Sequence, residues 1–507
     1  MAESILIIGA GIAGLAAGCY GQMNGYRTQV LEMHDKPGGL CTSWKRQGYT
    51  FDGCIHWLVG SGPHGALNRT WQELGALPGR QIVDHEEFMR VEGRDGRTLV
   101  VYTDLGRLER HMKEMAPADA KAIERFCRAA GRCARFGQAM AGAGRLSRLQ
   151  AMLRMLAFMG TAVRYGKVSM ESFAGRFRDP FLRQAFAAIF DLPDFSMIAA
   201  LMTLAWMHNR DAGYPVGGSL EFSRAIERRY LDLGGTIRYR SRVAKVLVDE
   251  VPGPGSPKGK VARAVGVRLA DGSEQRADVV ISAADGHATI FDLLDGQYLD
   301  EKIRGYYADL PIFQPIIQVS LGVACDLSHQ PHSIVFALPE PVTIAGQVRE
   351  RMGARHFGYD PTLAPAGKSV LAVILDSDYR YWKELSQDRE RYRAEKDRIA
   401  AVVIAQLERR FPDIAGHVEV VDVATPLTYE RYTGNWQGSM EGWLPSTRVA
   451  RLMMRGMRKT LPGLDHFYMA GQWVEPGGGV PTAAMSGRRA IGMICQRDGK
   501  RFEARLP

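Results

Sequence analysis

The chain opens on the stretch Ser4-Ile5-Leu6-Ile7-Ile8-Gly9-Ala10-Gly11-Ile12-Ala13-Gly14, and this stretch decides its fold. Residues 4–8 are an apolar run of the kind found in strands that are buried on both faces of a parallel sheet. The G-x-G-x-x-G loop at residues 9–14 follows at once and opens onto a helix-like segment, residues 12–23. This order of strand, glycine loop and helix predicts a Rossmann-type unit that binds a dinucleotide.

The glycines of the loop have different expected tasks. Gly9 permits the tight turn, Gly11 lets the backbone approach a pyrophosphate, and Gly14 lets helix and strand pack closely. The helix N-terminus offers free N–H groups and a partial positive charge to the phosphates. A second strand, residues 28–31, ends on Glu32, whose carboxylate suits a ribose diol and would repel a ribose phosphate. These features suit the ADP moiety of a dinucleotide.

Two further glycine turns lie near the two ends of the chain. The first contains Pro37-Gly38-Gly39 and follows directly on the acidic strand end. The second lies within residues 467–487, which have the pattern of a strand, a glycine turn and a helix start rich in small residues. Such a helix start could hold the N1/O2 edge of a flavin ring, because its N–H groups are free.

Together these ends resemble the FAD-dependent amine-oxidase-like superfamily, and the best match within it is the branch of phytoene desaturases, carotenoid isomerases and retinol saturases. Residues 48–56, 214–219, 425–428 and 430–433 extend the resemblance over the whole chain. It implies FAD as the cofactor and an apolar substrate. One position departs from the pattern, because Gln472 stands where many relatives carry an aspartate near the FAD phosphates or ribityl chain.

The motifs and the resemblance together predict the residues that bind FAD. In the resembled superfamily, the residue at Val243 typically offers its backbone to the adenine. The small residues after the strand at 279–282 are expected to pass close to the dinucleotide. The predicted cofactor residues are Gly9, Gly11, Ile12, Ala13, Gly14, Glu32, Met33, Gly38, Gly39, Leu40, His56, Trp57, Val243, Ala283, Ala284, Gly471, Gln472, Gly479, Val480, Pro481 and Ala484.

His56 is the predicted catalytic residue. It is the ionisable group most expected to face the flavin ring, where it could hydrogen-bond a heteroatom or donate a proton. A hydrogen-bonded structural histidine is an equally weighted alternative, and Asp52 is expected to fix the backbone turn. No paired carboxylates, Ser/His/Asp set or second nucleotide fingerprint accompany them. The flavin is therefore expected to carry out the chemistry without a nicotinamide domain.

The predicted fold class is α/β, with a Rossmann-like FAD-binding domain of the glutathione-reductase type. An α+β substrate domain is interleaved with it along the chain. The predicted FAD-binding domain comprises residues 1–75, 214–290 and 455–507. The predicted substrate domain comprises residues 76–213 and 291–454.

The composition excludes several classes of protein. The net charge of +10 comes without any nucleic-acid-binding motif, and the 12 histidines lack metal-ligand spacing, so neither nucleic acid nor metal is expected. The 7 cysteines lack paired spacing and indicate a reducing compartment. No apolar run is long enough to span a bilayer, and no signal peptide precedes the first strand. We expect a cytoplasmic protein that works at the inner face of the membrane.

The membrane expectation comes from residues 144–190, a helical segment that is basic and rich in Met and Phe. Helices of this kind can lie in a membrane interface, with the apolar side down and the arginines reaching the lipid headgroups. The alternative is that these helices are ordinary core helices of the substrate domain. Residues 425–443 are similarly ambiguous, because their tyrosines and tryptophans could line a substrate tunnel or pack between domains.

The predicted function is an FAD-dependent oxidoreductase that acts on C–C or C=C bonds of an isoprenoid, carotenoid- or polyene-like lipid. A desaturase, a saturase and an isomerase all fit, and the sequence does not separate them. Two alternatives remain: a flavin amine oxidase of the same fold, and a flavoprotein that binds a lipid without turnover. The oligomeric state and the electron donor or acceptor are not predicted.

Overall fold

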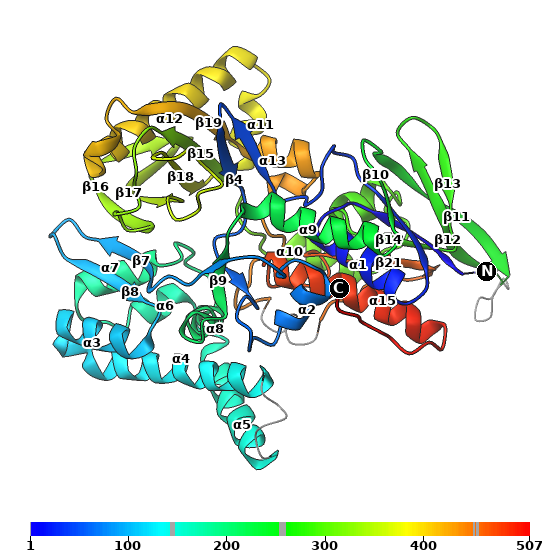
Figure 1. Cartoon of the computed structure of the whole chain (residues 1–507), viewed down its shortest axis with the longest axis horizontal. Helices are drawn as coiled ribbons and strands as arrows, with labels where there is room; N and C mark the ends of the chain where they lie inside the picture. The colour runs from blue at the N-terminus through cyan, green and yellow to red at the C-terminus, as the bar shows by residue number, and fades with distance from the viewer. Residues whose placement is uncertain (1, 142–147, 253–259, 450–451, 453–455) are drawn as a thin grey trace.

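A five-stranded parallel sheet carries the first glycine loop (Figure 1). Apolar side chains cover both of its faces: Ile5 and Ile7 pack against helices, while Leu6 and Ile8 pack against a neighbouring β-sheet. This explains the unbroken apolar run at residues 4–8. The strand order is β10 (Thr236–Arg238), β2 (Arg27–Leu31), β1 (Ser4–Ile8), β14 (Val279–Ser282) and β21 (Phe467–Met469).

Three helices lie on the first face of this sheet, and a smaller sheet lies on the second. The helices are α1 (Ile12–Met23), α9 (Gly218–Asp232) and α15 (Gly479–Arg497). The smaller sheet contains β11 (Val243–Pro252), β12 (Lys260–Leu269), β13 (Glu274–Arg276) and β20 (Leu464–Asp465). The structure is a computed structural model that describes residues 2–141, 148–252, 260–449, 452 and 456–507. The sequence of residues 252–260, rich in Pro, Gly and Lys, predicts a hairpin tip or surface loop, and most of it lies outside the described residues.

A seven-stranded mixed sheet forms the second region, at the upper left of Figure 1. Distant parts of the chain meet in it, because β7 pairs in parallel with β16. The order is β19 (Val418–Ala424), β15 (Ile316–Val323), β18 (Ser369–Asp376), β17 (Gln347–His356), β16 (Ser333–Ile344), β7 (Glu87–Glu92) and β8 (Thr98–Tyr102). The helices α11 (Tyr379–Leu385) and α12 (Arg389–Arg410) pack on it.

A helical region completes the molecule, and α5 projects from its edge (Figure 1). Its core is aromatic: Phe126, Phe173 and Phe186 contact one another with ring centroids 5.1–5.9 Å apart. The helices are α3 (Leu105–Met115), α4 (Ala120–Ala141), α5 (Arg148–Tyr165), α6 (Met170–Ala174), α7 (Pro180–Ala188) and α8 (Met197–His208). No helix among the described residues is long and apolar enough to cross a membrane.

The chain passes between these regions through short strands. The strand β9 pairs with both β5 and β6 and so joins three crossing segments. The remaining strands are β3 (Ser43–Arg46), β4 (Tyr49–Asp52), β5 (Leu58–Val59), β6 (Ile82–Val83) and β9 (Ala212–Pro215). The described residues also contain the helices α2 (Asn68–Glu73), α10 (Glu301–Asp309) and α13 (Pro426–Thr433), with single turns at Pro117–Asp119, Ala288–Asp292, Pro412–Ile414 and Trp436–Gly438.

Candidate functional site

The first glycine loop has the geometry that its sequence predicts. A β-carbon at Gly14 would lie 1.9 Å from the carbonyl oxygen of Gly9, so only glycine lets α1 approach the loop this closely. A β-carbon at Gly11 would have no atom within 4 Å, because that side of the loop opens onto a cavity. Gly11 is the N-cap of α1, and no side chain caps this helix. Its first N–H groups are therefore available to a phosphate.

The second glycine loop is fixed against the first. The Gly38 N–H donates to the Ala10 carbonyl at 2.9 Å, and a β-carbon at Gly39 would lie 3.4 Å from the Gly11 α-carbon. The buried Glu32 carboxylate accepts from the N–H groups of Ala10 at 2.7 Å and His34 at 2.8 Å. It keeps lone pairs for a ribose hydroxyl, because a carboxylate offers about four acceptor sites.

A cavity of about 1160 Å³ extends from these loops to the C-terminal glycine turn and into the helical region. Pockets that hold one drug-sized ligand measure roughly 300–1,000 Å³, so this cavity has room for a dinucleotide and part of a substrate. Nearly all the predicted cofactor residues line it: Gly9, Gly11, Ile12, Ala13, Glu32, Met33, Gly38, Gly39, Leu40, His56, Trp57, Val243, Ala283, Ala284, Gly471, Gln472, Gly479, Val480 and Pro481.

Gly14 and Ala484, predicted as cofactor residues, are not among the lining residues. Gly14 packs against the backbone of Gly9 and the side chain of Ala283, behind the cavity wall. Ala484 is fully buried in the core that α15 shares with α1 and the sheet. Both small residues hold the wall in place, because they let the helices approach closely.

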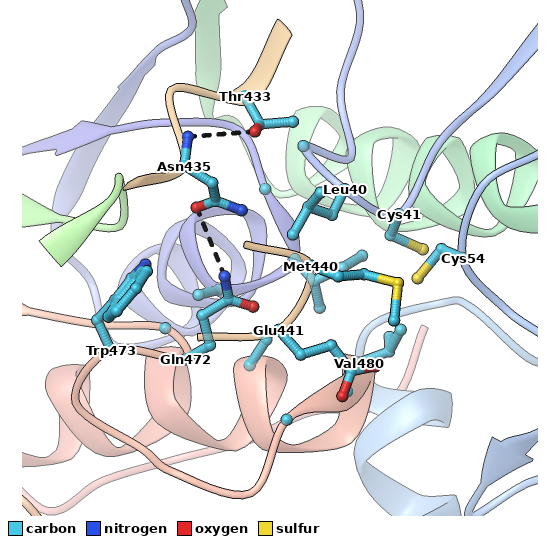
Figure 2. A pocket seen from close by; sticks show the side chains of 18 of the residues that line it. Leu40, Cys41, Cys54, Thr433, Asn435, Met440, Glu441, Gln472, Trp473 and Val480 are labelled. Atoms are coloured by element: carbon cyan, nitrogen blue, oxygen red, sulfur yellow. Dashed lines mark hydrogen bonds between the residues drawn. The ribbon is translucent and has the colours of Figure 1, made fainter. Parts of the chain in front are cut away.

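The C-terminal turn places a second uncapped helix start at the cavity. Gly477, Gly478 and Gly479 have φ of +129°, +69° and +78°, which favour glycine at each position. No side chain caps the N-terminus of α15. Its first N–H groups face the cavity and have no capping partner. Around this helix start, Figure 2 shows Leu40, Met440, Glu441, Gln472 and Val480. Gln472 lies near Asn435, with Nε2 and Oδ1 3.5 Å apart.

Asp52 fixes the backbone that carries His56, as predicted. Its carboxylate accepts from the N–H of Cys54 at 3.0 Å and from the N–H and hydroxyl of Ser219, both at 2.6 Å. The Ser219 hydroxyl also accepts from the Ile55 N–H at 2.8 Å. Burial outweighs these donors and raises the pKa of Asp52 to about 6. Asp52 is therefore a structural carboxylate that positions the backbone segment carrying His56.

His56 lines the cavity and packs against aromatic rings. Its centroid lies 6.3 Å from the rings of both Trp57 and Phe357. Burial, with a smaller effect of Arg355, holds the pKa of His56 well below its usual range. The imidazole is therefore neutral at neutral pH, which suits a hydrogen-bonding role better than that of a charged proton donor.

The aromatic residues of the 425–443 segment divide between the two alternatives. Tyr432 lines the cavity. Trp443 is fully buried and donates from Nε1 to the Trp473 carbonyl at 3.0 Å, while Tyr429 donates to Gln318 at 2.9 Å. Trp436 stacks on His287 with centroids 4.8 Å apart. Packing between segments therefore accounts for Tyr429, Trp436 and Trp443. Other residues form the walls at the apolar end of the cavity.

The predicted site residues do not include those other walls, although the apolar sequence at 198–206 predicts that it lines or caps the substrate domain. The helical region contributes Phe190, Leu192, Phe195 and Trp206 to the cavity, and the loop after α13 contributes Met440 and Glu441. Burial alone raises the pKa of Glu441 to about 7. An apolar segment beside the predicted cofactor block was the available signal for the helical wall. A lone acid in a glycine-rich loop gave none.

This fold and site define a class: a Rossmann-type flavoprotein with two glycine loops at the pyrophosphate position and an uncapped helix start at the other end of one cavity. The chain matches the family described as "Flavin containing amine oxidoreductase" over residues 12–491 and belongs to it. Its cofactor is FAD, and the protein is a flavin-dependent oxidoreductase.

Curated relatives span nearly the whole chain at low identity. The chain is 26% identical to a prolycopene isomerase of Daucus carota over 95% of this chain and 78% of that protein. It is also 26% identical to a neurosporene-forming phytoene desaturase of Rhodobacter capsulatus over 96% and 93% of the two chains. The predicted resemblance to this carotenoid branch is confirmed.

Solved structures confirm the predicted fold. An oxidoreductase from Methanosarcina mazei is similar with a TM-score of 0.61 and 18% identity, over 96% of this chain and 100% of that chain. A double mutant of putrescine oxidase with redesigned cofactor binding is similar with a TM-score of 0.60 and 16% identity, over 98% of this chain and 99% of that chain. At these identities the likeness establishes the fold alone.

The residues present fit FAD. The open side of Gly11 and the uncapped α1 start would hold the pyrophosphate, and Glu32 would hold the ribose of the adenosine part. The uncapped start of α15 would face the flavin. When bound, FAD supplies an acceptor for a hydride. Among the described residues, no group of three or more His, Cys, Asp or Glu side chains is placed to hold a metal ion.

Proposed function

We propose that this flavoprotein oxidises, reduces or isomerises C–C or C=C bonds of an apolar isoprenoid of the carotenoid or polyene type. The observation that carries the proposal is the wall of the cavity beyond the flavin region. Phe190, Phe195 and Trp206 extend it into the helical region, so a long apolar chain would lie against aromatic and aliphatic surface. The curated relatives that act on prolycopene and phytoene support this substrate class.

Amine oxidation is the second candidate, and one observation favours it. The Glu441 carboxyl faces the same cavity, and a carboxylate there could pair with a substrate ammonium group. The apolar extension of the cavity weighs against a small cationic substrate. A protein that only binds a lipid is the third alternative.

Anaerobic flavin spectroscopy tests these candidates. Phytoene in detergent micelles is added to the oxidised FAD-loaded protein, and putrescine is added to a second sample. We expect phytoene to bleach the flavin band and putrescine to leave it unchanged. NADPH alone should also leave it unchanged, since the chain has one nucleotide fingerprint. Bleaching by putrescine alone would establish the amine-oxidase alternative. Binding of phytoene, prolycopene and lycopene to oxidised and reduced protein without any conversion would establish lipid carriage.

We further propose that α5 contacts a membrane surface. One side of α5 packs on the protein, where Phe158 stacks on Phe136 with centroids 4.0 Å apart and Thr161 and Tyr165 are buried. The other side carries large apolar side chains that are 41–78% exposed, spaced along one helical face: Met152, Met155, Leu156, Met159 and Val163, with Leu153 beside them. Arg164 and Lys167 are exposed at the end of the same segment.

This combination suits an anionic lipid surface, because apolar side chains enter the headgroup region while the cations pair with the headgroups. Residues 144–147 of the predicted segment lie outside the described residues. The experiment is sedimentation with vesicles of equal parts phosphatidylcholine and phosphatidylglycerol. We expect binding that weakens with salt and falls when Leu156 and Val163 are changed to Ser. The matched control changes Val348 and Val421 to Ser, which are 67% and 43% exposed on the seven-stranded sheet. Equal binding by both variants would contradict the proposal.

A further inference from the structure

The loop at residues 439–444 holds Glu441 in a fixed place on the cavity wall. The Phe313 N–H donates to the Gly442 carbonyl at 2.8 Å, and the Leu444 N–H donates to the Pro311 carbonyl at 2.9 Å. Ser439 connects the loop to the neighbouring segment. Its hydroxyl donates to the Phe313 carbonyl at 3.1 Å and accepts from the Gly442 N–H, within the loop, at 3.2 Å. The backbone of Glu441 is thus constrained on both sides.

The carboxyl group of Glu441 lies against the start of α15. A β-carbon built on Gly478 would lie 2.2 Å from the Glu441 Oε2 atom and 3.1 Å from the Phe313 ring. Figure 2 shows Glu441 beside Val480 and Met440, opposite Leu40. The group therefore stands where the glycine turns that face the flavin meet the apolar part of the cavity.

Glu441 has no partner among the described residues, neither a hydrogen-bond donor nor a cation. The contrast with Glu475 on the same cavity is clear, because Glu475 pairs with both Lys459 and Arg489. The surface that Glu441 keeps exposed opens onto the cavity. A buried carboxyl without a partner is costly, and proteins keep such groups mainly where they act.

The titratable groups around Glu441 do not compensate its charge. The Glu441 carboxylate acts on the thiol of Cys54, and the imidazole of His56 lines the same cavity. A hydrogen bond with Cys41 and burial raise the pKa of Cys54 well above its usual range, and burial lowers that of His56, so both groups are neutral at neutral pH. Glu441 can therefore gain or lose a proton near neutral pH, since burial raises its pKa to about 7.

We infer that Glu441 exchanges the proton that accompanies hydride transfer at the substrate, a role that rests on the proposed function. In the oxidising direction, one C–H bond breaks and its electron pair leaves with the hydrogen as hydride to FAD, the two-electron oxidant. The neighbouring C–H bond breaks, and its proton goes to the Glu441 carboxylate. The electron pair left behind forms the C=C bond. In the reducing direction, Glu441 returns the proton as FAD is reoxidised.

Single-turnover kinetics test this role in the FAD-loaded protein. Anaerobic flavin bleaching by phytoene is followed in the wild type, in Glu441→Gln and in Glu441→Asp, with the flavin content of each measured after denaturation. We expect full FAD content in all three. We expect Glu441→Gln to react about 10²–10⁴-fold more slowly, the typical contribution of a positioned proton-transfer group, and Glu441→Asp to recover part of the rate. The wild-type rate should rise with pH through about 7, and the Glu441→Gln rate should be flat.

Infrared difference spectroscopy gives a readout that does not need turnover. Between pH 5 and 9 (about two units on each side of the pKa of Glu441) the wild type should lose the C=O band of a protonated carboxyl group. Part of this change centres near pH 6, where Asp52, Asp211 and Asp285 titrate, and Glu441→Gln should lack only the part centred near pH 7. Glu475→Gln, the matched control, should keep it, because the carboxyl that it removes is held by two cations.

The outcomes separate the two levels of the proposal. A wild type that converts phytoene as fast as Glu441→Gln does, with the same pH profile, overturns the role of Glu441 and leaves the proposed function standing. A wild type that is inert toward phytoene, prolycopene and lycopene overturns both. Flavin bleaching by putrescine that Glu441→Gln abolishes would assign Glu441 to binding a cation. The same infrared change in the wild type and in Glu441→Gln would overturn the role directly.

Discussion

Gly11 is the residue at which the fold and the cofactor can be separated. Its φ of −65° and ψ of 173° are accessible to other residues, and a β-carbon would meet no atom within 4 Å. We therefore predict that Gly11→Leu folds but loses FAD, because the side chain fills the space needed for the pyrophosphate. The measurement is flavin absorbance per protein after denaturation, with circular dichroism as a check on folding. Gly160→Leu, at another uncrowded position without positive φ, should keep FAD. Full flavin content in Gly11→Leu would contradict the assignment of the loop.

His56 and Glu441 make different predictions about the reaction rate. Burial keeps the His56 imidazole neutral, so its expected contribution is one hydrogen bond to a flavin heteroatom. We expect His56→Ala to lose this bond, which is worth about 1 kcal/mol, and to react roughly five-fold more slowly. The pH profile should keep its rise through about 7, which belongs to Glu441. Single-turnover bleaching across this pH range is the measurement. A loss of the pH dependence in His56→Ala would assign proton transfer to His56 instead.

The sequence predicted the cavity residues that a local motif places and missed those that long-range packing brings in. Gly9, Gly11 and Glu32 lie within a single βαβ unit, so spacing alone predicted their places. Glu441 reaches the cavity only because its loop pairs with residues 311–313 and lies against α15. No local pattern indicates such a contact.

The same distinction holds for helices and strands. The predicted strand at 4–8 and helix at 12–23 have the bounds of β1 and α1. The strand β17 was not predicted, because Arg349, Arg351 and Arg355 make its sequence polar, and it forms by pairing with β16 and β18. The apolar spacing within residues 386–410 predicts one long helix. The helix α12 begins at Arg389 instead, because Asp388 caps it by accepting from the N–H groups of Glu390 and Arg391.

The junction between β7 and β16 contains a pair of stacked histidines with a predictable pH dependence. The rings of His85 and His332 lie 3.7 Å apart at the start of these strands. Burial, followed by the nearby positive groups, lowers the pKa of His85 to about 4 and of His332 to about 2. In the unfolded chain both histidines bind a proton near pH 6.5, whereas in the folded state they bind it only at lower pH. The free energy of unfolding is therefore highest above pH 6.5 and decreases as the pH falls toward 4.

We predict that His332→Phe, which keeps an aromatic ring in the stack, loses less stability than the wild type between pH 6.5 and 4. The difference should be on the order of 1–3 kcal/mol. Urea denaturation at a series of pH values measures it. His329→Phe, at a side chain that is 57% exposed, is the control for exchanging a histidine for a phenylalanine. Parallel curves for the wild type and His332→Phe would refute the effect.

At the scale of the whole molecule, the cavity is lined by parts of the chain that lie far apart in the sequence. Its walls come from the loop after β1, from α8 and from the start of α15. FAD should therefore stabilise the complete fold by mass action, by about 2.7 kcal/mol at a free concentration of 100 Kd. We predict that the Tm of the FAD-free protein rises with added FAD and that the Tm of Gly11→Leu does not. Calorimetry measures both. An equal rise in the two proteins would show that FAD binds elsewhere.

The order of the strands in the parallel sheet also determines how long β1 must wait, during synthesis of the chain, for its neighbour β14. Ser4 on β1 bonds to Asp278 beside β14, and these residues lie 274 positions apart. At about 5–20 residues per second, the ribosome makes that length of chain in roughly 15–55 s. Throughout this interval the apolar β1 lacks one of its neighbours and is open to aggregation or to a chaperone. The last wall of the cavity, α15, emerges later still, so we expect FAD to load only after residue 479 has been made.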